Sequence, residues 1–140
     1  MRALPALLLL ASCASVGASA TPPERVTGCW INRDAGVVTM RWLPDRARAG
    51  MLKGVRATYG QAGAQDVQNY SLQTSEVGWS MCQLDEGDVA TACWQVAEGD
   101  GGSLEGGRVF LDVYGERLRI AIVGDGPERV VFHGVRDGCD

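Results

Sequence analysis

Hydrophobic and polar residues alternate in short runs along this chain, and glycines separate the runs from one another. In residues 37–42, Val38, Met40 and Trp42 would share one face of a strand. No segment keeps the 3.6-residue hydrophobic period of a helix for three turns. The pattern therefore predicts an all-β protein of eight or nine strands. These are a short strand around Trp30 and the segments 37–42, 51–59, 67–74, 77–84, 90–97, 108–114, 117–123 and 129–135.

One hairpin near the C-terminus can be assigned a register from the sequence alone. A turn centred on Gly115-Glu116 brings hydrophobic residues opposite one another on one face of the hairpin. A slip of one residue would put the two hydrophobic sets out of phase, so the turn and the pattern support the same register. The predicted apolar pairs are Val113 with Leu118, Leu111 with Ile120 and Val109 with Ile122. The other face pairs Asp112 with Arg119, Tyr114 with Arg117 and Phe110 with Ala121.

A second hairpin, centred on a two-residue turn at Gly87-Asp88, brings Cys82 opposite Cys93. Residues that face each other on antiparallel strands lie about 4.5–5.5 Å apart at Cα, which is within the range of a disulfide. The register of this hairpin therefore favours a Cys82–Cys93 bridge.

Four cysteines follow Cys13 in the sequence, and an even number in an exported chain indicates two disulfides. Four cysteines allow three pairings, and their number alone does not choose among them. In an up-and-down antiparallel barrel the first and last strands are neighbours, so the start of one lies beside the end of the other. Cys29 and Cys139 fall at those two positions. We therefore predict a barrel that closes on itself and carries the Cys29–Cys139 and Cys82–Cys93 bridges.

The N-terminus has the pattern of an export signal with two possible ends. Met1-Arg2 precedes an apolar run, residues 3–11, that is too short to span a bilayer permanently. The residues before Cys13 resemble a bacterial lipobox, whereas Ala18-Ser19-Ala20 fits an ordinary A-x-A cleavage site. We favour lipidation of Cys13, which places the protein in the bacterial periplasm or on the outer membrane; ordinary cleavage would give a soluble secreted protein. The expected organisation is a signal over 1–20 (or 1–12), a tether to about residue 25, and a barrel domain over 26–140.

Length and charge narrow the class of protein further. The 140 residues suffice for one domain, and the net charge of −4 is unlike that of a nucleic-acid-binding protein. Residues 1–56 contain eight Lys and Arg against three acids, and residues 57–107 contain eight acids and neither Lys nor Arg. This separation predicts either a solvated surface or a dipole that steers a charged partner.

Several short motifs resemble a known family. Gly28-Cys29-Trp30 resembles the Gly-x-Trp of lipocalin-like (calycin-type) barrels. Together with Arg41-Trp42-Leu43-Pro44, the run from Gly50-Met51-Leu52 through Arg56 is similar to a bacterial lipocalin-like domain family of unknown function. The C-terminal runs Leu118-Arg119-Ile120-Ala121 and Val130-Val131-Phe132 are similar to the end of that family. The resemblance implies an up-and-down barrel and no particular activity, because barrels of this kind serve unrelated functions.

The sequence does not favour catalysis. His133 is the only histidine, there is no Gly-x-Ser-x-Gly motif, and pairing of the cysteines would leave no thiol nucleophile in the barrel. His133 is a candidate haem ligand, and the acidic glycine-rich turns 85–88 and 98–102 are candidate calcium sites, but the spacing of an EF-hand is absent. We therefore expect a non-enzymatic protein without a metal or a cofactor.

Aromatic residues suggest a binding function instead. If they line the barrel, they form a cavity for a small apolar or anionic ligand, with Arg56 as the cation that orients an acid. The alternative is that they fill the core of a narrow barrel, and a cavity above about 300 Å³ would decide between the two. A competing hypothesis is a protein–protein inhibitor, for example of an envelope protease or lysozyme, that acts through the loop Leu43–Gly50. In either case we expect a monomer that contacts a membrane only through its anchor. The predicted ligand-binding residues are Met40, Trp42, Arg56, Tyr59, Tyr70, Trp79 and Trp94.

Overall fold

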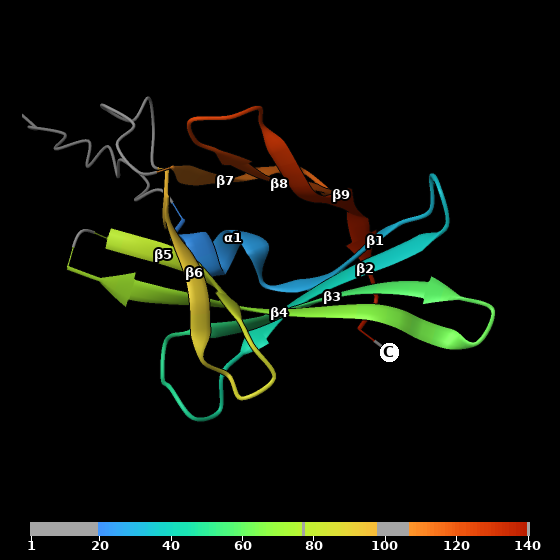
Figure 1. Cartoon of the computed structure of the whole chain (residues 1–140), viewed down its shortest axis with the longest axis horizontal. Coiled ribbons are helices and arrows are strands. Elements are labelled where there is room, and N and C mark those ends of the chain that lie inside the picture. Colours follow the sequence, from blue (N-terminus) through green and yellow to red (C-terminus); the bar gives the residue numbers. More distant parts are fainter. Residues whose placement is uncertain (1–19, 77, 98–106, 140) are drawn as a thin grey trace, which may run out of the picture.

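The structure, a computed structural model, describes residues 20–76, 78–97 and 107–139. Nine strands follow one another around a closed barrel, and the last strand pairs with the first (Figure 1). The all-β barrel fold is thereby confirmed, whereas the predicted export signal and Cys13 lie outside the described residues. The strands are β1 (Gly28–Asn32), β2 (Val37–Pro44), β3 (Leu52–Gly60), β4 (Gly63–Ser75), β5 (Gly78–Leu84), β6 (Ala90–Val96), β7 (Arg108–Tyr114), β8 (Arg117–Val123) and β9 (Arg129–Asp137).

One pair of strands departs from the predicted antiparallel order. β6 and β7 run parallel and share a short ladder in which Gln95 faces Arg108 and Val96 faces Val109. The backbone N–H of Ala97 extends this ladder by donating to the carbonyl of Val109 at 2.9 Å. A parallel pair cannot be joined by a tight hairpin, and the chain between β6 and β7 is longer than the turns that join the other strands. The barrel is therefore mixed rather than wholly antiparallel.

The register predicted for the β7–β8 hairpin is confirmed at every pair, on both faces. In the β5–β6 hairpin the Cys82–Cys93 pair is also confirmed, but the predicted two-residue turn is wrong. The register shifts between Gln83 and Leu84, and the turn spans residues 85–89. Asp85 holds this wider turn, because its Oδ1 accepts the backbone N–H groups of Gly87 (2.8 Å) and Val89 (3.0 Å).

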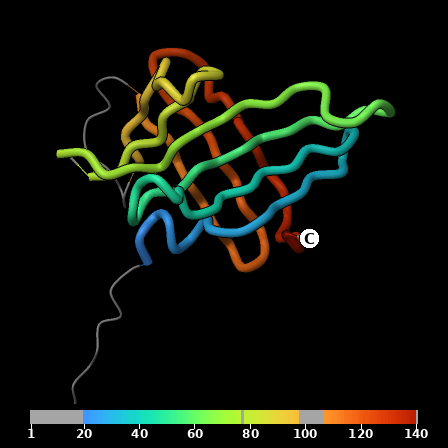
Figure 2. Tube along the Cα trace, turned by 90° about the horizontal axis from the view of Figure 1, so that it is seen from below, coloured from blue at the N-terminus to red at the C-terminus, as the bar shows by residue number. Residues whose placement is uncertain are grey.

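Both predicted disulfides are present, and they join positions that the register already brings close. Cys82 and Cys93 lie 4.0 Å apart at Cα in directly opposed positions of β5 and β6. Cys29 and Cys139 lie 5.3 Å apart at Cα. In Figures 1 and 2 the C-terminal end of the chain (red) lies close to the first strand (blue), as the β1–β9 ladder requires. Two disulfides indicate an oxidising, exported compartment.

A short helix, α1 (Pro22–Val26), forms where the sequence predicts the tether and the first residues of the domain. Thr21 and Glu24 form a capping box, and a proline occupies the first turn, as is typical of a helix start. Val26 is fully buried, and its carbonyl accepts the indole N–H of Trp30 at 2.9 Å. The helix is therefore part of the barrel's core. Within the described residues no helix is long and apolar enough to cross a membrane.

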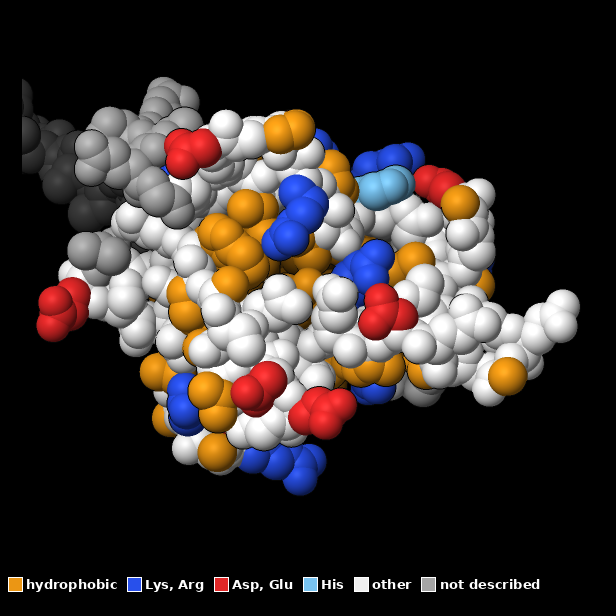
Figure 3. All heavy atoms as spheres, viewed as in Figure 1, with side chains coloured by type: hydrophobic (Ala, Val, Ile, Leu, Met, Phe, Trp, Pro, Cys, Tyr) orange, Lys and Arg blue, Asp and Glu red, His pale blue; other side chains and the backbone are white. Residues whose placement is uncertain are grey.

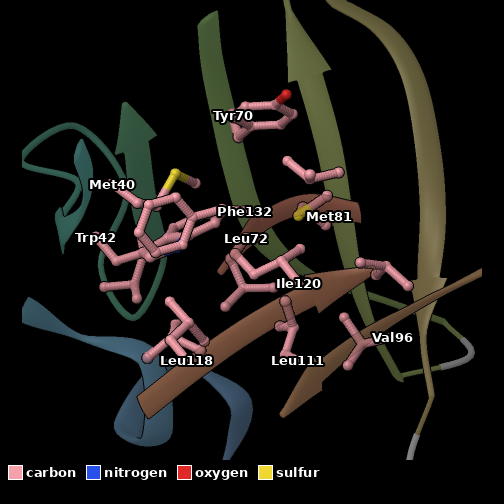
Figure 4. Packing of buried hydrophobic residues seen from close by; sticks show 14 of the residues in the cluster. Met40, Trp42, Tyr70, Leu72, Met81, Val96, Leu111, Leu118, Ile120 and Phe132 are labelled. Atoms are coloured by element: carbon pink, nitrogen blue, oxygen red, sulfur yellow. The ribbon is translucent and has the colours of Figure 1, made fainter. Parts of the chain in front are cut away.

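The interior of the barrel is filled by side chains, as Figure 4 shows for the labelled residues. Space is tight between β2 and β3, because a Cβ on Gly54 would lie 2.7 Å from the ring of Trp42. Large buried side chains therefore occupy the centre of the barrel among the described residues. Fully buried interior side chains include Met40, Trp42, Leu72, Met81, Val109, Leu118 and Ile120.

Candidate functional site: the barrel mouth

The two ends of the barrel differ in chemistry. At one end α1 borders a pocket together with Leu52 and Thr74, where β3 begins and β4 ends. Towards the other end the inward-facing residues of these two strands become polar, and they include Arg56 and Gln68, which pair across the β3–β4 ladder. Together with the start of β9 they surround a pocket of about 220 Å³, which we call the mouth pocket. Its lining residues are Arg56, Gln68, Tyr70, Gln83, Arg129, Val130 and Val131.

Backbone and side-chain hydrogen bonds hold the polar groups of the mouth pocket in place. Arg56 reaches across the barrel, and its Nε donates to the carbonyl of Val131 in β9 at 2.8 Å. Tyr70 is buried, and its hydroxyl donates to Oε1 of Gln68 at 2.7 Å. Figure 4 shows the Tyr70 ring at the edge of the core cluster, with its hydroxyl pointing away from Leu72 and Ile120. Polar groups therefore close the core at this end.

Among the described residues, the arginines of the mouth, Arg56 and Arg129, form no ion pair with a carboxylate. Arg129 lies over the ring of Trp94, 5.6 Å from its centroid. Burial raises the pKa of Tyr70, the charges of Arg56 and Arg129 oppose that rise, and Asp66 adds to it. The charges of both guanidinium groups thus lower the pKa of the same tyrosine hydroxyl.

A second hollow of about 330 Å³ lies beside the mouth pocket, and Arg56, Val130 and Val131 line both. Its remaining residues are Asn32, Asp34, Ala35, Val38, Phe132 and His133. On the face of the molecule shown in Figure 3, Lys and Arg side chains (blue) lie beside exposed hydrophobic atoms (orange). Cationic and apolar groups therefore adjoin each other at the surface.

The structure brings together only part of the predicted ligand-binding set. Arg56 and Tyr70 line the mouth pocket. The ring of Trp94 contacts the guanidinium group of Arg129, which also lines it. Met40 and Trp42 are fully buried in the packed core. The two other predicted residues lie elsewhere: Trp79 borders the pocket beside α1, and Tyr59 is exposed near the end of β3.

Three polar residues of the mouth pocket were not predicted: Gln68, Gln83 and Arg129. The pairing of β3 with β4 and of β4 with β5 places Gln68 opposite Arg56 and Gln83 opposite Tyr70. No register was predicted for these two strand pairs, so neither glutamine was singled out. Arg129 carried no signal either, because its place depends on a register shift between Ile120 and Ala121 in the β8–β9 pair.

The donors at the mouth suit an anion. Guanidinium N–H groups and two side-chain amides can donate to carboxylate, phosphate or sulfate oxygens, whereas the O–H of Tyr70 is already donated to Gln68. Within the described residues there is no group of three or more His, Cys, Asp and Glu side chains that could hold a metal ion, and the turn 98–102 lies outside them. His133 lies on the exposed face of β9, where its backbone carbonyl accepts from Nδ2 of Asn32 at 2.7 Å.

Comparisons with known proteins do not assign this chain to a family. No protein-family model, no curated protein and no solved structure matches it. The lipocalin-like resemblance of its short motifs therefore stays a prediction.

Proposed function

We propose that this protein is an exported, non-catalytic binding module of the bacterial envelope that holds a small anionic ligand at its barrel mouth. One observation carries the proposal: Arg56 and Arg129 flank the buried hydroxyl of Tyr70, and neither cation has a carboxylate partner within the described residues. Cations grouped at one pocket repel each other, so a bound anion would stabilise the arrangement. Hydrogen bonds to charged groups contribute about 1.5–3 kcal/mol each.

The size of the ligand follows from the packing below the mouth. The mouth pocket has a volume of about 220 Å³, and buried side chains such as Met81 and Phe132 fill the barrel beneath it. A long apolar chain would have to displace this core, at a cost of several kcal/mol. A compact carboxylate, phosphate or sulfate needs no such rearrangement.

The cellular location that we propose follows from the N-terminal sequence. Acylation of Cys13 would anchor the barrel to the outer membrane, whereas cleavage after Ala20 would release it. Mass spectrometry of the native N-terminus distinguishes the two. An acylated Cys13 supports the anchor, and a free Thr21 rules it out.

Anion binding is tested by calorimetric titration of the mature protein with acetate, benzoate, phosphate and sulfate at constant ionic strength. We expect at least one of these anions to bind, and Arg56→Gln and Arg129→Gln to weaken that binding tenfold to a hundredfold, by about 1.5–3 kcal/mol. Arg41→Gln is the matched control, because Arg41 is an exposed arginine of β2 that lines none of the pockets described above. Its affinity should equal that of the parent protein.

The Arg129→Gln variant distinguishes a loss of anion binding from a loss of folding. Arg56→Gln also removes the hydrogen bond to Val131, so Arg129→Gln, which breaks no backbone contact, is the more specific test. Circular dichroism establishes that each variant is folded. Absence of binding by all four anions, or equal weakening by Arg41→Gln, would refute the proposal.

A second candidate is a protein–protein inhibitor that acts through the predicted loop 43–50, of which Leu43 and Pro44 belong to β2 and the remainder lies between β2 and β3. Hydrogen bonds support a preformed loop: the N–H of Asp45 donates to the carbonyl of Met51 (2.9 Å), and the N–H of Ala47 donates to Oδ1 of Asp45 (2.9 Å). A guanidinium N–H of Arg48 donates to Oε1 of Gln73 (3.2 Å). Preformed loops lose less entropy on binding. Replacing residues 44–49 would abolish inhibition of an envelope protease or lysozyme and leave anion affinity unchanged.

A further inference from the structure

The outer surface of the barrel carries a groove that shares only Val130 with the mouth pocket. It follows β1, β8 and β9 on their outward faces and has a volume of about 530 Å³. We call it the outer groove. Outward residues such as Ile31, Val135 and Arg117 face one another across the β1–β9 and β8–β9 ladders, and Tyr114 pairs with Arg117 in the β7–β8 hairpin. The groove is therefore built mainly on paired strands, and Arg33 and Asp34 border it from the β1–β2 connection.

Apolar side chains in the outer groove are unusually exposed. Tyr114 is 71% exposed, Val130 44% and Val135 40%, and they are three of the seven large hydrophobic residues that are exposed within the described part of the chain. Exposed hydrophobic residues that gather in one depression, rather than lying scattered, mark interaction sites. Tyrosine in particular provides a large contact area with few rotatable bonds.

The charge around the outer groove is mostly positive. Arg33, Arg117 and Arg119 line it, and Asp34 is the one acid among its lining residues. Arg119 pairs with Glu128, but Arg33 and Arg117 form no salt bridge within residues 20–76, 78–97 and 107–139. This local excess contrasts with the whole chain, whose net charge is −4.

We propose that the outer groove docks an acidic, partly apolar peptide segment of a partner protein. Tyrosine and arginine are the residues enriched at protein interfaces and at their energetic centres, and both occur here with an apolar floor. Acidic side chains of the partner would meet Arg33 and Arg117, and an apolar side chain would cover Tyr114 and Val135. A concave groove, unlike a flat face, suits one extended segment of a partner. The groove shares Val130 with the mouth pocket, but Tyr114 and Arg117 line neither mouth hollow, so variants at these two residues test the groove separately from the anion site.

Selection from a random peptide display library against the mature protein tests the proposal without a known partner. We expect the selected peptides to combine Asp or Glu with an aromatic or aliphatic residue. Because the whole chain is negatively charged, non-specific attraction would favour basic peptides instead, so enrichment of acids indicates a local site. Failure to select any peptide, or selection of basic or uncharged ones, would overturn the proposal.

Variants then locate the site of the selected peptide by fluorescence anisotropy. Tyr114→Ser and Arg117→Glu should each weaken its binding at least about tenfold. The matched controls Tyr59→Ser and Arg41→Glu alter an exposed tyrosine and an exposed arginine on other strands and should leave the affinity unchanged. Equal loss in test and control variants would refute the groove as the site. Concentration-dependent dimerisation that Tyr114→Ser abolishes would assign the groove to a second copy and likewise overturn the proposal.

Discussion

The guanidinium group of Arg136 lies over the indole of Trp30, with its central carbon 4.2 Å from the ring centroid. The same arginine donates from a guanidinium N–H to the carbonyl of Thr27 at 3.2 Å, and from its backbone N–H to the carbonyl of Glu116 at 2.8 Å. Trp30 in turn donates its indole N–H to Val26 in α1. This cluster joins the helix, the first and last strands and the β7–β8 turn, which are the elements that close the barrel.

Replacing Arg136 should therefore weaken the closure of the barrel. We expect Arg136→Ala to lower the free energy of unfolding by about 1–3 kcal/mol, the sum of a cation–π contact and one hydrogen bond. The free energy of unfolding of Arg136→Lys should lie between those of the parent protein and Arg136→Ala, because lysine keeps the charge but not the planar stacking group. Urea unfolding with intact disulfides measures both. Arg41→Ala provides the baseline for an exposed strand arginine, and an equal loss there would contradict the assignment.

The two disulfides should contribute unequally to stability. They close loops with sequence separations of 110 residues (Cys29–Cys139) and 11 residues (Cys82–Cys93). Restriction of the unfolded chain predicts about 4–5 kcal/mol for the first and about 3 kcal/mol for the second. Urea unfolding of Cys29→Ala/Cys139→Ala and of Cys82→Ala/Cys93→Ala compares them. A larger loss from the second pair would mean that packing around the buried Cys82 outweighs chain entropy.

Gly54 and Trp42 should be energetically coupled. A Cβ at position 54 would lie 2.7 Å from the indole ring, so Gly54→Ala should destabilise the protein by about 1–3 kcal/mol through overpacking. Trp42→Phe relieves the crowding and also removes a buried indole N–H that has no acceptor within the described residues. The double variant should therefore lose at least about 0.5 kcal/mol less than the sum of the single variants in urea unfolding.

A glycine with free space provides the control for that cycle. A Cβ on Gly126 would meet nothing within 4 Å, so Gly126→Ala should change the free energy of unfolding little and show no coupling to Trp42→Phe. Additive losses at Gly54 and Trp42 would show that the indole can move away from a new methyl group.

The fold was largely predictable because strand register leaves a strong trace in the sequence. In the β7–β8 hairpin every hydrophobic residue constrains the same alignment, and the cysteines constrain the β5–β6 and β1–β9 alignments. Helix α1 left no such trace, since five residues are too few to show a period. The parallel β6–β7 pair rests on two residue pairs, which no alternation of hydrophobic residues could single out.

The mouth pocket was only half predictable for a related reason. Arg56 and Tyr70 stand out by residue type, and both line the pocket. Trp42 and Met40 stand out equally, but the barrel is packed at their level and they serve the core. Residue type cannot distinguish these outcomes, because the inward face of one strand passes from core to mouth within two positions, from Gly54 to Arg56.

The buried hydroxyl of Tyr70 should make stability depend on pH in the alkaline range. Burial, the largest cause, raises its pKa above the ordinary value of 10.0. The unfolded chain therefore releases the phenolic proton at a lower pH than the folded protein does. The contribution of the protonated Tyr70 phenol to the free energy of unfolding is fully present below about pH 10. It is lost as the pH rises from there through the folded-state pKa.

Urea unfolding between about pH 8 and about pH 11 tests this dependence. Tyr70→Phe should lose less stability across that range than the parent protein, because it has no phenol to ionise. Gln68→Ala removes the hydrogen-bond partner of the hydroxyl but keeps the phenol, so it should retain the alkaline loss. An anion bound beside Tyr70 would oppose its ionisation and raise the folded-state pKa further, so the loss would begin at the same pH but become larger. Identical pH profiles for the parent and Tyr70→Phe would show that the folded protein exposes this hydroxyl to water.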